Sequence, residues 1–358
     1  MIKTNLDMSF SQIFVEKRTR KDTFLRQINQ IIKWQPIEKE INKVYKKGFS
    51  VDGRPSYPGI LLFKMLLLEQ WYNLSDPDVE DMVNDSLSTM RFCGLQLEDD
   101  VPDHSVVSRF RKELTERKAF DRLLGKINGQ LKGKGIMVKE GVTMVDAAIT
   151  DTPRQPKGKA TYEIASDRHE DEREEEEKAK EEESMVLIKQ TQAGVDTEAR
   201  WLKKSGKLRY GFKRHISVED EGLVLAVHTT TANEHDSKGL KKIVKKTPKK
   251  NMKKGILGDK GFKVPDNDKL LKDEGIKNRI QHKAYRNRPL TEWEVYFNKL
   301  ISKQRYKVER TFGGMKRWFG TGKARYVGLS KTHSQHVLEA IAYNLYRSPG
   351  IIMSKSLG

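Results

Sequence analysis

Cysteine is nearly absent from this chain of 358 residues, which contains only Cys93. One thiol can neither close an intrachain disulfide nor build a cysteine-rich zinc site, and this fits a reducing compartment such as the cytoplasm. Long apolar runs are missing as well. The richest one, residues 60–74, is interrupted by Lys64, Glu69 and Gln70 and is too short to span a bilayer, so it predicts a buried helix. The first residues also lack the apolar run of a signal peptide, and we expect a cytoplasmic protein without a membrane partner.

Acidic residues are outnumbered, with 50 Asp and Glu against 69 Lys and Arg, which gives a formal net charge of +19. Such an excess in a chain long enough for two domains predicts a polyanionic partner, with nucleic acid as the first candidate. The one strong exception is the segment 166–184, which holds 11 acids and 4 bases. A run of this kind is typical of a solvated helix or a disordered loop, and we interpret it as an insertion around residues 153–205.

The first third of the chain has helical periodicity, and it predicts helices over 24–44, 57–74, 76–92 and 105–131. Ser75 and Asp78 have the spacing of a capping box, and Asp103 can cap the next helix. That helix carries Arg109 and Arg111, which either bind DNA phosphates or form the ordinary exposed face of a basic protein. The character of the sequence changes near residue 135, where we expect a domain boundary.

The pattern after residue 139 is that of short strands. It predicts strands over 141–149, 209–218 and 223–231, then a Lys-rich helix, a strand over 255–258, a helix over 266–274, a strand over 278–281 and a long helix. The long helix begins at Thr291, where Glu294 completes a second capping box, and we expect a break near Gly313. The order β-β-β-α-β-α-β-α is that of an RNase H-like fold, so the predicted class is α/β (α+β) with a mixed sheet behind a helical N-terminal domain.

Three acids are placed where such a sheet makes side chains converge. Asp146 lies inside an apolar strand, Asp259 ends the strand over 255–258, and Glu309 lies on the long helix. Each has an ordinary alternative: a satisfied buried acid, a turn former, and half of an ion pair with Arg305. Their joint placement favours a site for two Mg²⁺ ions, about 3.5–4 Å apart, which suit carboxylate ligands and phosphodiester chemistry; Mn²⁺ is expected to substitute.

Cations accompany these acids. Arg305, Glu309 and Lys316 lie four and seven residues apart, which places them on one face of a helix. Lysine pairs four residues apart, beginning with Lys241 and Lys245, form a broad cationic face that Pro248 must end or kink. This face predicts non-specific contact with the DNA backbone, with a merely solvated surface as the alternative.

Together these features resemble the DDE transposases of bacterial insertion sequences, in the insertion-sequence-five-like group whose last acid lies in a Y-x2-R-x3-E-x6-K signature. Arg305, Glu309 and Lys316 match that signature, and Ser302 stands where the tyrosine is expected. The other matching stretches run from about residue 50 to 347. They are Gly53-Arg54-Pro55, Leu74-Ser75-Asp76, Pro102-Asp103-His104-Ser105, Ser108-Arg109-Phe110-Arg111, Val145-Asp146-Ala147, Tyr210-Gly211-Phe212-Lys213, Ala232-Asn233-Glu234-His235-Asp236, Gly258-Asp259-Lys260-Gly261-Phe262 and Ala342-Tyr343-Asn344-Leu345.

The resemblance implies a catalytic metal triad of Asp146, Asp259 and Glu309, with phosphates held by Arg305 and Lys316. It implies DNA cleavage at terminal inverted repeats and attack of the freed 3′-hydroxyl on target DNA, by a homodimer at the bacterial nucleoid. The expected organisation is a repeat-binding helical domain over residues 1–135, a catalytic domain over 136–348 and a tail over 349–358. Two other interpretations stay open: a catalytically inactive repressor of the element, and an RNase H-like nuclease that cleaves without joining.

Overall fold

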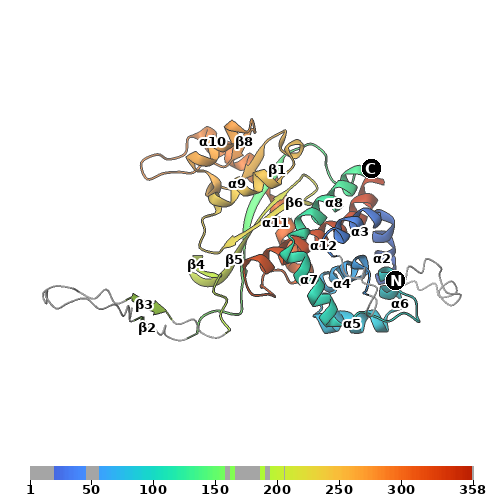
Figure 1. Cartoon of the computed structure of the whole chain (residues 1–358). Helices are drawn as coiled ribbons and strands as arrows, with labels where there is room; N and C mark the ends of the chain where they lie inside the picture. The colour runs from blue at the N-terminus through green and yellow to red at the C-terminus, as the bar shows by residue number, and fades with distance from the viewer. Residues whose placement is uncertain are drawn as a thin grey trace, which may run out of the picture.

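The computed structural model describes residues 20–45, 56–157, 162–165, 186–189, 194–204 and 206–356. Its helical region and its sheet region lie side by side, and the strand pair β2 (Tyr162–Ala165) and β3 (Val186–Lys189) is drawn apart from both (Figure 1). Two features of the sequence, the Gly53-Arg54-Pro55 stretch and the acidic run 166–184, lie outside the described residues. Among the helices that are described, none is long and apolar enough to cross a membrane.

The helical region is built from more and shorter helices than predicted. Its helices within the described residues are α2 (Arg20–Ile31), α3 (Gln35–Asn42), α4 (Gly59–Tyr72), α5 (Asp76–Asp85), α6 (Leu87–Cys93), α7 (His104–Glu116) and α8 (Ala119–Gly133). Three predicted helices are each divided in two: before Pro36, at Ser86, and at Lys118, whose φ is 50°. The caps were predicted correctly, because Ser75 and Asp78 form a capping box and Asp103 accepts hydrogen bonds from two amides of α7.

The sheet has the predicted mixed topology. Its strands are β1 (Thr143–Asp151), β4 (Arg200–Lys204), β5 (Lys207–Val218), β6 (Val224–Thr231), β7 (Ile256–Gly258) and β8 (Asn278–Ile280). The central order is β6-β5-β1-β7-β8, in which β5 is antiparallel to β1 and β6, while β7 and β8 run parallel to β1. The element order and the helical region before it confirm the predicted fold class.

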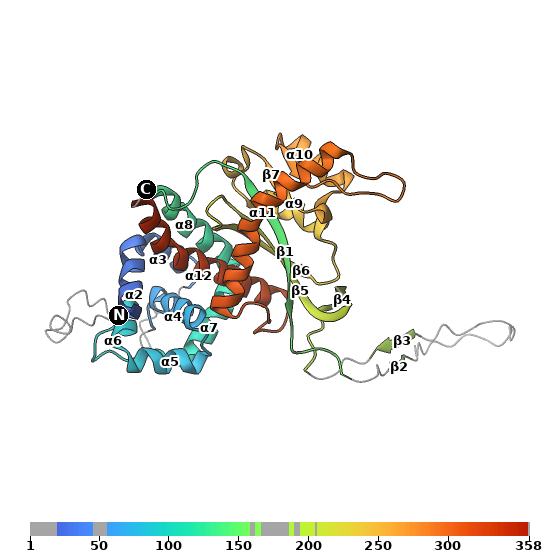
Figure 2. The same ribbon diagram turned by 180° about the vertical axis from the view of Figure 1, so that it is seen from behind.

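Helices cover both faces of this sheet. On one face, α9 (Asp236–Lys246) approaches β5 so closely that a Cβ atom built on Gly239 would lie 2.4 Å from the ring of His215. On the other face lie α11 (Glu292–Phe319) and α12 (Leu329–Ser356), seen in front of β1 and beside α8 in Figure 2. The short α10 (Pro265–Asp273) packs near β8, and 3-10 turns follow α9 and β7 as η1 (Lys249–Met252) and η2 (Lys260–Phe262).

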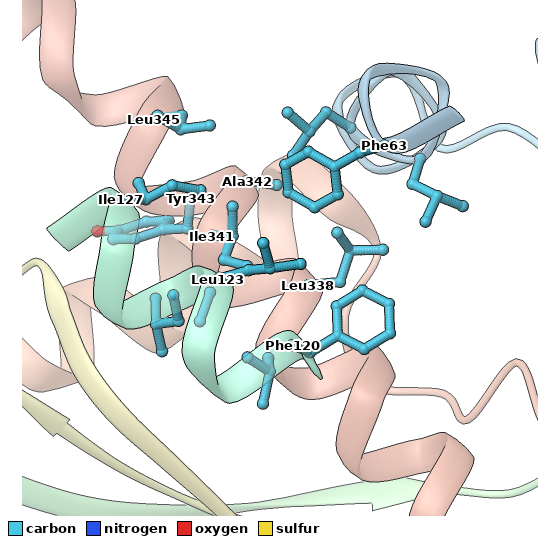
Figure 3. Packing of buried hydrophobic residues seen from close by; sticks show 14 of the residues in the cluster. Phe63, Phe120, Leu123, Ile127, Leu338, Ile341, Ala342, Tyr343 and Leu345 are labelled. Atoms are coloured by element: carbon cyan, nitrogen blue, oxygen red, sulfur yellow. The ribbon is translucent and has the colours of Figure 1, made fainter. Parts of the chain in front are cut away.

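Two expectations about the C-terminal helices were wrong. Helix α11 continues through Gly313 and Gly314 without a break, and α12 runs on to Ser356 through the segment predicted to be a tail. Helix α12 is buried because it lies between the sheet and the helical region, where Leu338, Ile341 and Leu345 meet α4 and α8 (Figure 3). One continuous hydrophobic cluster therefore extends from α2 to β6, across the loop in which residue 135 lies.

A buried charge network corrects the prediction for Arg111. The side chain of Arg111 is 9% exposed and donates to Glu69 Oε2 at 2.7 Å and to Asp76 Oδ2 at 3.1 Å. Arg325 completes the coordination of Glu69, with Nη1 2.9 Å from Oε1. Arg111 thus neutralises Glu69, an acid that interrupts the apolar run of α4, and its side chain is buried in this ion pair, whereas Arg109 is exposed.

Replacing Arg111 tests this structural role. We expect Arg111→Met to lower the free energy of unfolding by about 3 kcal/mol, because it leaves Asp76 and part of the charge of Glu69 without a partner. The matched change Arg109→Met, two residues away on the exposed side of α7, should alter it by less than about 0.5 kcal/mol. Urea denaturation of both variants gives the comparison, and equal stability of the two would contradict the assignment.

A second prediction concerns Gly211, where β5 leaves β4 and joins the main sheet. A Cβ atom at this position would lie 2.1 Å from the carbonyl oxygen of Thr150, so Gly211→Ala should destabilise the protein by about 1–3 kcal/mol. Gly313→Ala is the control, because nothing lies within 4 Å of its added Cβ and the residue is inside a helix. That variant should gain up to about 1 kcal/mol, and thermal unfolding measures both.

Candidate active site

Asp146 lies in the middle of β1, on the sheet face covered by α11 and α12. Its neighbour Ala148 is paired with Arg214, which contacts Glu339 of α12, and side chains alternate along a strand, so Asp146 and Arg214 share a face. The Asp146 side chain is 20% exposed. Its Oδ1 atom accepts a hydrogen bond from the amide of Ala147 at 2.8 Å. Its Oδ2 atom lies 3.5 Å from Nη2 of Arg305 on α11.

Asp259 follows directly after β7. Because Met144 is paired with Leu257 in parallel register, Asp259, just beyond the end of β7, lies level with Asp146 in the neighbouring strand β1. Asp259 caps η2, and its Oδ1 atom accepts from the amide of Gly261 at 2.8 Å. The turn-forming role of Asp259 is compatible with a role beside Asp146, because the cap of η2 uses only the Oδ1 atom of the carboxylate.

The surroundings of Asp146 change the pKa of its carboxyl group. Burial raises the pKa of Asp146 to about 6, and the negative charges of Asp259 and Asp236 add to the effect, while Arg305 and the amide of Ala147 oppose it. Asp236 was not among the predicted site residues. It begins α9, and its Oδ1 atom lies 2.8 Å from Nζ of the buried Lys213. The stretches Tyr210–Lys213 and Ala232–Asp236, both noted in the sequence, are thus joined by an ion pair next to the predicted acids.

Glu309 lies one helical turn after Arg305 on α11, and it is exposed. Arg305 pairs with Asp146 rather than with Glu309, contrary to the ion pair that the spacing allowed. Within the described part of the chain, no three His, Cys, Asp or Glu side chains form a group that could hold a metal ion. The structure therefore brings Asp146 close to Asp259 and to Arg305, and it does not assemble Glu309 with the two aspartates.

The chemistry of the donor set can be compared with that of the expected metal. Asp146 and Asp259 offer carboxylate oxygens, the ligands preferred by Mg²⁺ and Mn²⁺. Burial disfavours the ionised form of Asp146, which is held by one amide and by a long contact with Arg305. The Nε atom of Arg305 has no hydrogen-bond partner among the described residues. An added divalent cation would offset the charge of the buried carboxylate, so the two aspartates fit a hard cation. Glu309, one helical turn from Arg305 on α11, is the candidate for a third ligand.

Ser302, which stands where the family signature has a tyrosine, is connected to Arg305 through the side chain of Gln281. Ser302 Oγ accepts from Nε2 of Gln281 at 2.7 Å, and Oε1 of Gln281 lies 3.5 Å from Nη1 of Arg305. Gln281 directly follows β8, so this bridge fixes α11 to the outer strand and orients the arginine beside Asp146. No feature of the sequence singled out Gln281.

The predicted DNA-contacting cations have different environments. Lys316, Lys241 and Lys245 are exposed on α11 and α9. The cationic face is less uniform than its spacing suggested, because three of its lysines pair with acids: Lys246 with Asp121, Lys249 with Glu274 and Lys253 with Glu140. Helix α9 ends at Lys246, two residues before Pro248, as predicted. His235 caps α9 by accepting from the amide of Ser237, which is a structural role.

Comparison with known proteins places this chain in a family. Residues 13–113 match the model of a transposase domain (DUF772), and residues 139–345 match that of the transposase DDE domain. The transposase for insertion sequence element IS1106 of Neisseria meningitidis serogroup B is 34% identical over 241 residues, which are 67% of this chain and 76% of that protein. A solved piggyBac transposase synaptic complex with hairpin DNA aligns at 12% identity with a TM-score of 0.43, covering 93% of this chain and 76% of that one. The chain belongs to the DDE transposases of bacterial insertion sequences.

Proposed function

We propose that this transposase cleaves DNA at the terminal inverted repeats of its element and joins the freed 3′-hydroxyl to target DNA. The observation that carries the proposal is the pair Asp146 and Asp259, which lie level with each other on neighbouring parallel strands, with Arg305 against Asp146. Two Mg²⁺ ions, when bound, supply the Lewis acidity that activates an attacking oxygen and stabilises a leaving oxygen on phosphorus. Mn²⁺ has the same ligand preference and is expected to replace Mg²⁺.

The residues of the chain then have distinct tasks. Asp146, Asp259 and Glu309 hold the cations, and no side chain acts as a nucleophile, since the attacking oxygen comes from water or from DNA. Arg305 lies against Asp146, and its guanidinium can bind a DNA phosphate as readily as a carboxylate, because both anions accept charged hydrogen bonds. Lys316 contacts a phosphate further along the same helix.

Duplex DNA approaches through the exposed cations of both regions. Arg109 on α7 belongs to the region proposed to hold the terminal repeat, and Lys241 and Lys245 on α9 contact the backbone of the DNA without regard to sequence. A homodimer acting on paired ends at the nucleoid, in the cytoplasm, completes the proposal.

The roles of Asp259 and Glu309 are tested with isosteric variants. We expect Asp259→Asn and Glu309→Gln each to reduce cleavage at the repeat end by about 100-fold or more. Each variant removes one carboxylate charge that would hold the divalent cations, and these cations would stabilise the negative charge of the transition state. Asparagine keeps the acceptor for the amide of Gly261, so the cap of η2 survives. Glu292→Gln, at the exposed start of α11, is the control and should retain wild-type activity.

The assay uses a labelled duplex with the flanking inverted repeat, a target plasmid and Mg²⁺, and it follows cleaved and joined products separately. Both products from the wild type, and neither from the two variants, are expected. Cleavage without any joined product would favour the nuclease. Tight binding with no cleavage by any of the proteins would favour the inactive repressor.

Asp146 gives a prediction for the dependence of stability on pH. Its pKa is raised from 3.8 to about 6 in the folded chain, so the protonated form is favoured by folding, and stability is lost as the pH rises through this range. In the absence of metal, Asp146→Asn should therefore be more stable than the wild type at pH 8, by up to about 3 kcal/mol, and equally stable near pH 3.5. The same variant should be inactive in the cleavage assay.

Urea unfolding at several pH values in the presence of a chelator measures the effect. Asp273→Asn on the exposed side of α10 is the control, for which the difference from the wild type should stay small at every pH. An Asp146→Asn variant that is less stable than the wild type at pH 8 would show that the carboxylate is a satisfied structural acid, the ordinary alternative for this residue.

A further inference from the structure

A basic two-stranded ribbon extends beyond the main sheet. We define it as β4, residues 200–204, with residues 207–211 of β5. Strand β1 ends at Asp151, which is paired with Gly211, so β4 is the strand that pairs with residues 207–210 of β5 in the described part of the chain. Beyond Asp151, the amide of Thr152 still donates to the carbonyl oxygen of Tyr210 at 2.9 Å. The two strands are joined through Gly206, whose φ of 77° allows the tight reversal. Figures 1 and 2 both place β4 on the side of the sheet away from the helical region.

The base of the ribbon is held by its arginines. Nε of Arg209 lies 2.8 Å from Oδ1 of Asp151, and Arg200 donates to the carbonyl oxygen of Ala199 at 2.9 Å. The ring of Trp201 packs against that of Tyr210, with 4.9 Å between centroids, and the Tyr210 hydroxyl donates to the carbonyl oxygen of Asp196 at 2.7 Å. These contacts set the direction of the ribbon.

The tip of the ribbon carries positive charge. Lys203, Lys204 and Lys207 are exposed on either side of Gly206, and no acidic residue occurs in the sequence between Glu198 and Glu219. Lysines on an edge strand have an ordinary explanation, which is that they prevent edge-to-edge association of sheets. Here, however, the ribbon also exposes two large apolar side chains, Trp201 at 43% and Leu208 at 68%, which a merely protected edge does not need. This combination is typical of a surface that meets a partner.

The position of the ribbon relative to the aspartates points to the partner. Asp146 and Asp151 are five residues apart on β1, which is about 17 Å along an extended strand. Successive phosphates of a strand advance by about 3.4 Å along the axis of a duplex. A duplex whose axis followed β1, with a phosphodiester at Asp146, would therefore bring phosphates about five base pairs away level with the base of the ribbon. The major groove of B-DNA accepts a two-stranded ribbon.

We propose that the basic ribbon lies in the major groove of duplex DNA beside the catalytic aspartates and contacts phosphates through Lys203, Lys204 and Lys207. The proposal rests on the proposed function, because it takes the DNA to be cut at Asp146 and Asp259. It assigns a DNA-binding role to the C-terminal part of the segment that the sequence indicated as an acidic insertion.

The test compares two variants with the same reduction in charge. One carries Lys203→Gln, Lys204→Gln and Lys207→Gln, and the control carries Lys269→Gln, Lys272→Gln and Lys277→Gln, which are exposed around α10 and β8 at the opposite edge of the sheet. Binding of a fluorescent duplex with the terminal repeat, and of a random duplex of equal length, is titrated over a range of KCl concentrations in the presence of a chelator. Melting temperatures verify that both variants are folded.

For the ribbon variant we expect the slope of log K against log salt concentration to fall by about 0.9 for each phosphate that the ribbon no longer neutralises, up to about 2.7, with either duplex. The control variant should keep the wild-type slope. Equal slopes for the two variants would overturn the proposal, and that is the result expected if the lysines face the acidic run 166–184 of their own chain. A wild-type protein that binds no duplex overturns the ribbon and the proposed function together, whereas the expected slopes without cleavage remove only the transposition chemistry.

Discussion

The burial of α12 between the sheet and the helical region is the constraint on which the arrangement of the chain depends. Glu339 of α12 and Arg214 of β5 form an ion pair whose side chains are 2% and 3% exposed, and breaking such a pair leaves a charge without water. Asn344 binds both the amide and the carbonyl of Val224, which fixes the register of α12 against β6. Strand β5 is in turn paired with β1, so the same contacts position Asp146.

The regular elements could be predicted from the sequence wherever local chemistry decides them. Short β-rich segments bounded by glycine or charged residues predicted β1, β5 and β6, and the capping boxes at Ser75 and Thr291 predicted two helix starts correctly. What failed depended on tertiary contacts. Local patterns could not show that α12 continues through Pro349 within a buried environment, or that Gly313 remains helical because α11 packs along the sheet.

The candidate site was predictable in part for the same reason. Strand position placed Asp146 beside Asp259, but the involvement of Asp236 required knowledge that α9 begins at the same edge. Arg111 was mistaken for a surface cation because spacing alone does not distinguish the buried side of α7 from the exposed one. Similarly, His333 and His336 have no signature in the sequence, yet they connect Thr229 with Asp121 and Thr150 by hydrogen bonds through the interior.

The contact between Trp71 and Ala342 has a consequence for synthesis of the protein. The indole of Trp71 donates to a carbonyl 271 residues further along the chain, and the core around it is completed only by the last helix. Contacts so distant in sequence form late, after the entropy of closing a long loop has been overcome. A nascent chain on the ribosome therefore carries an incomplete core around α4 until the last helix has been synthesised, and a product truncated before α12 cannot complete it.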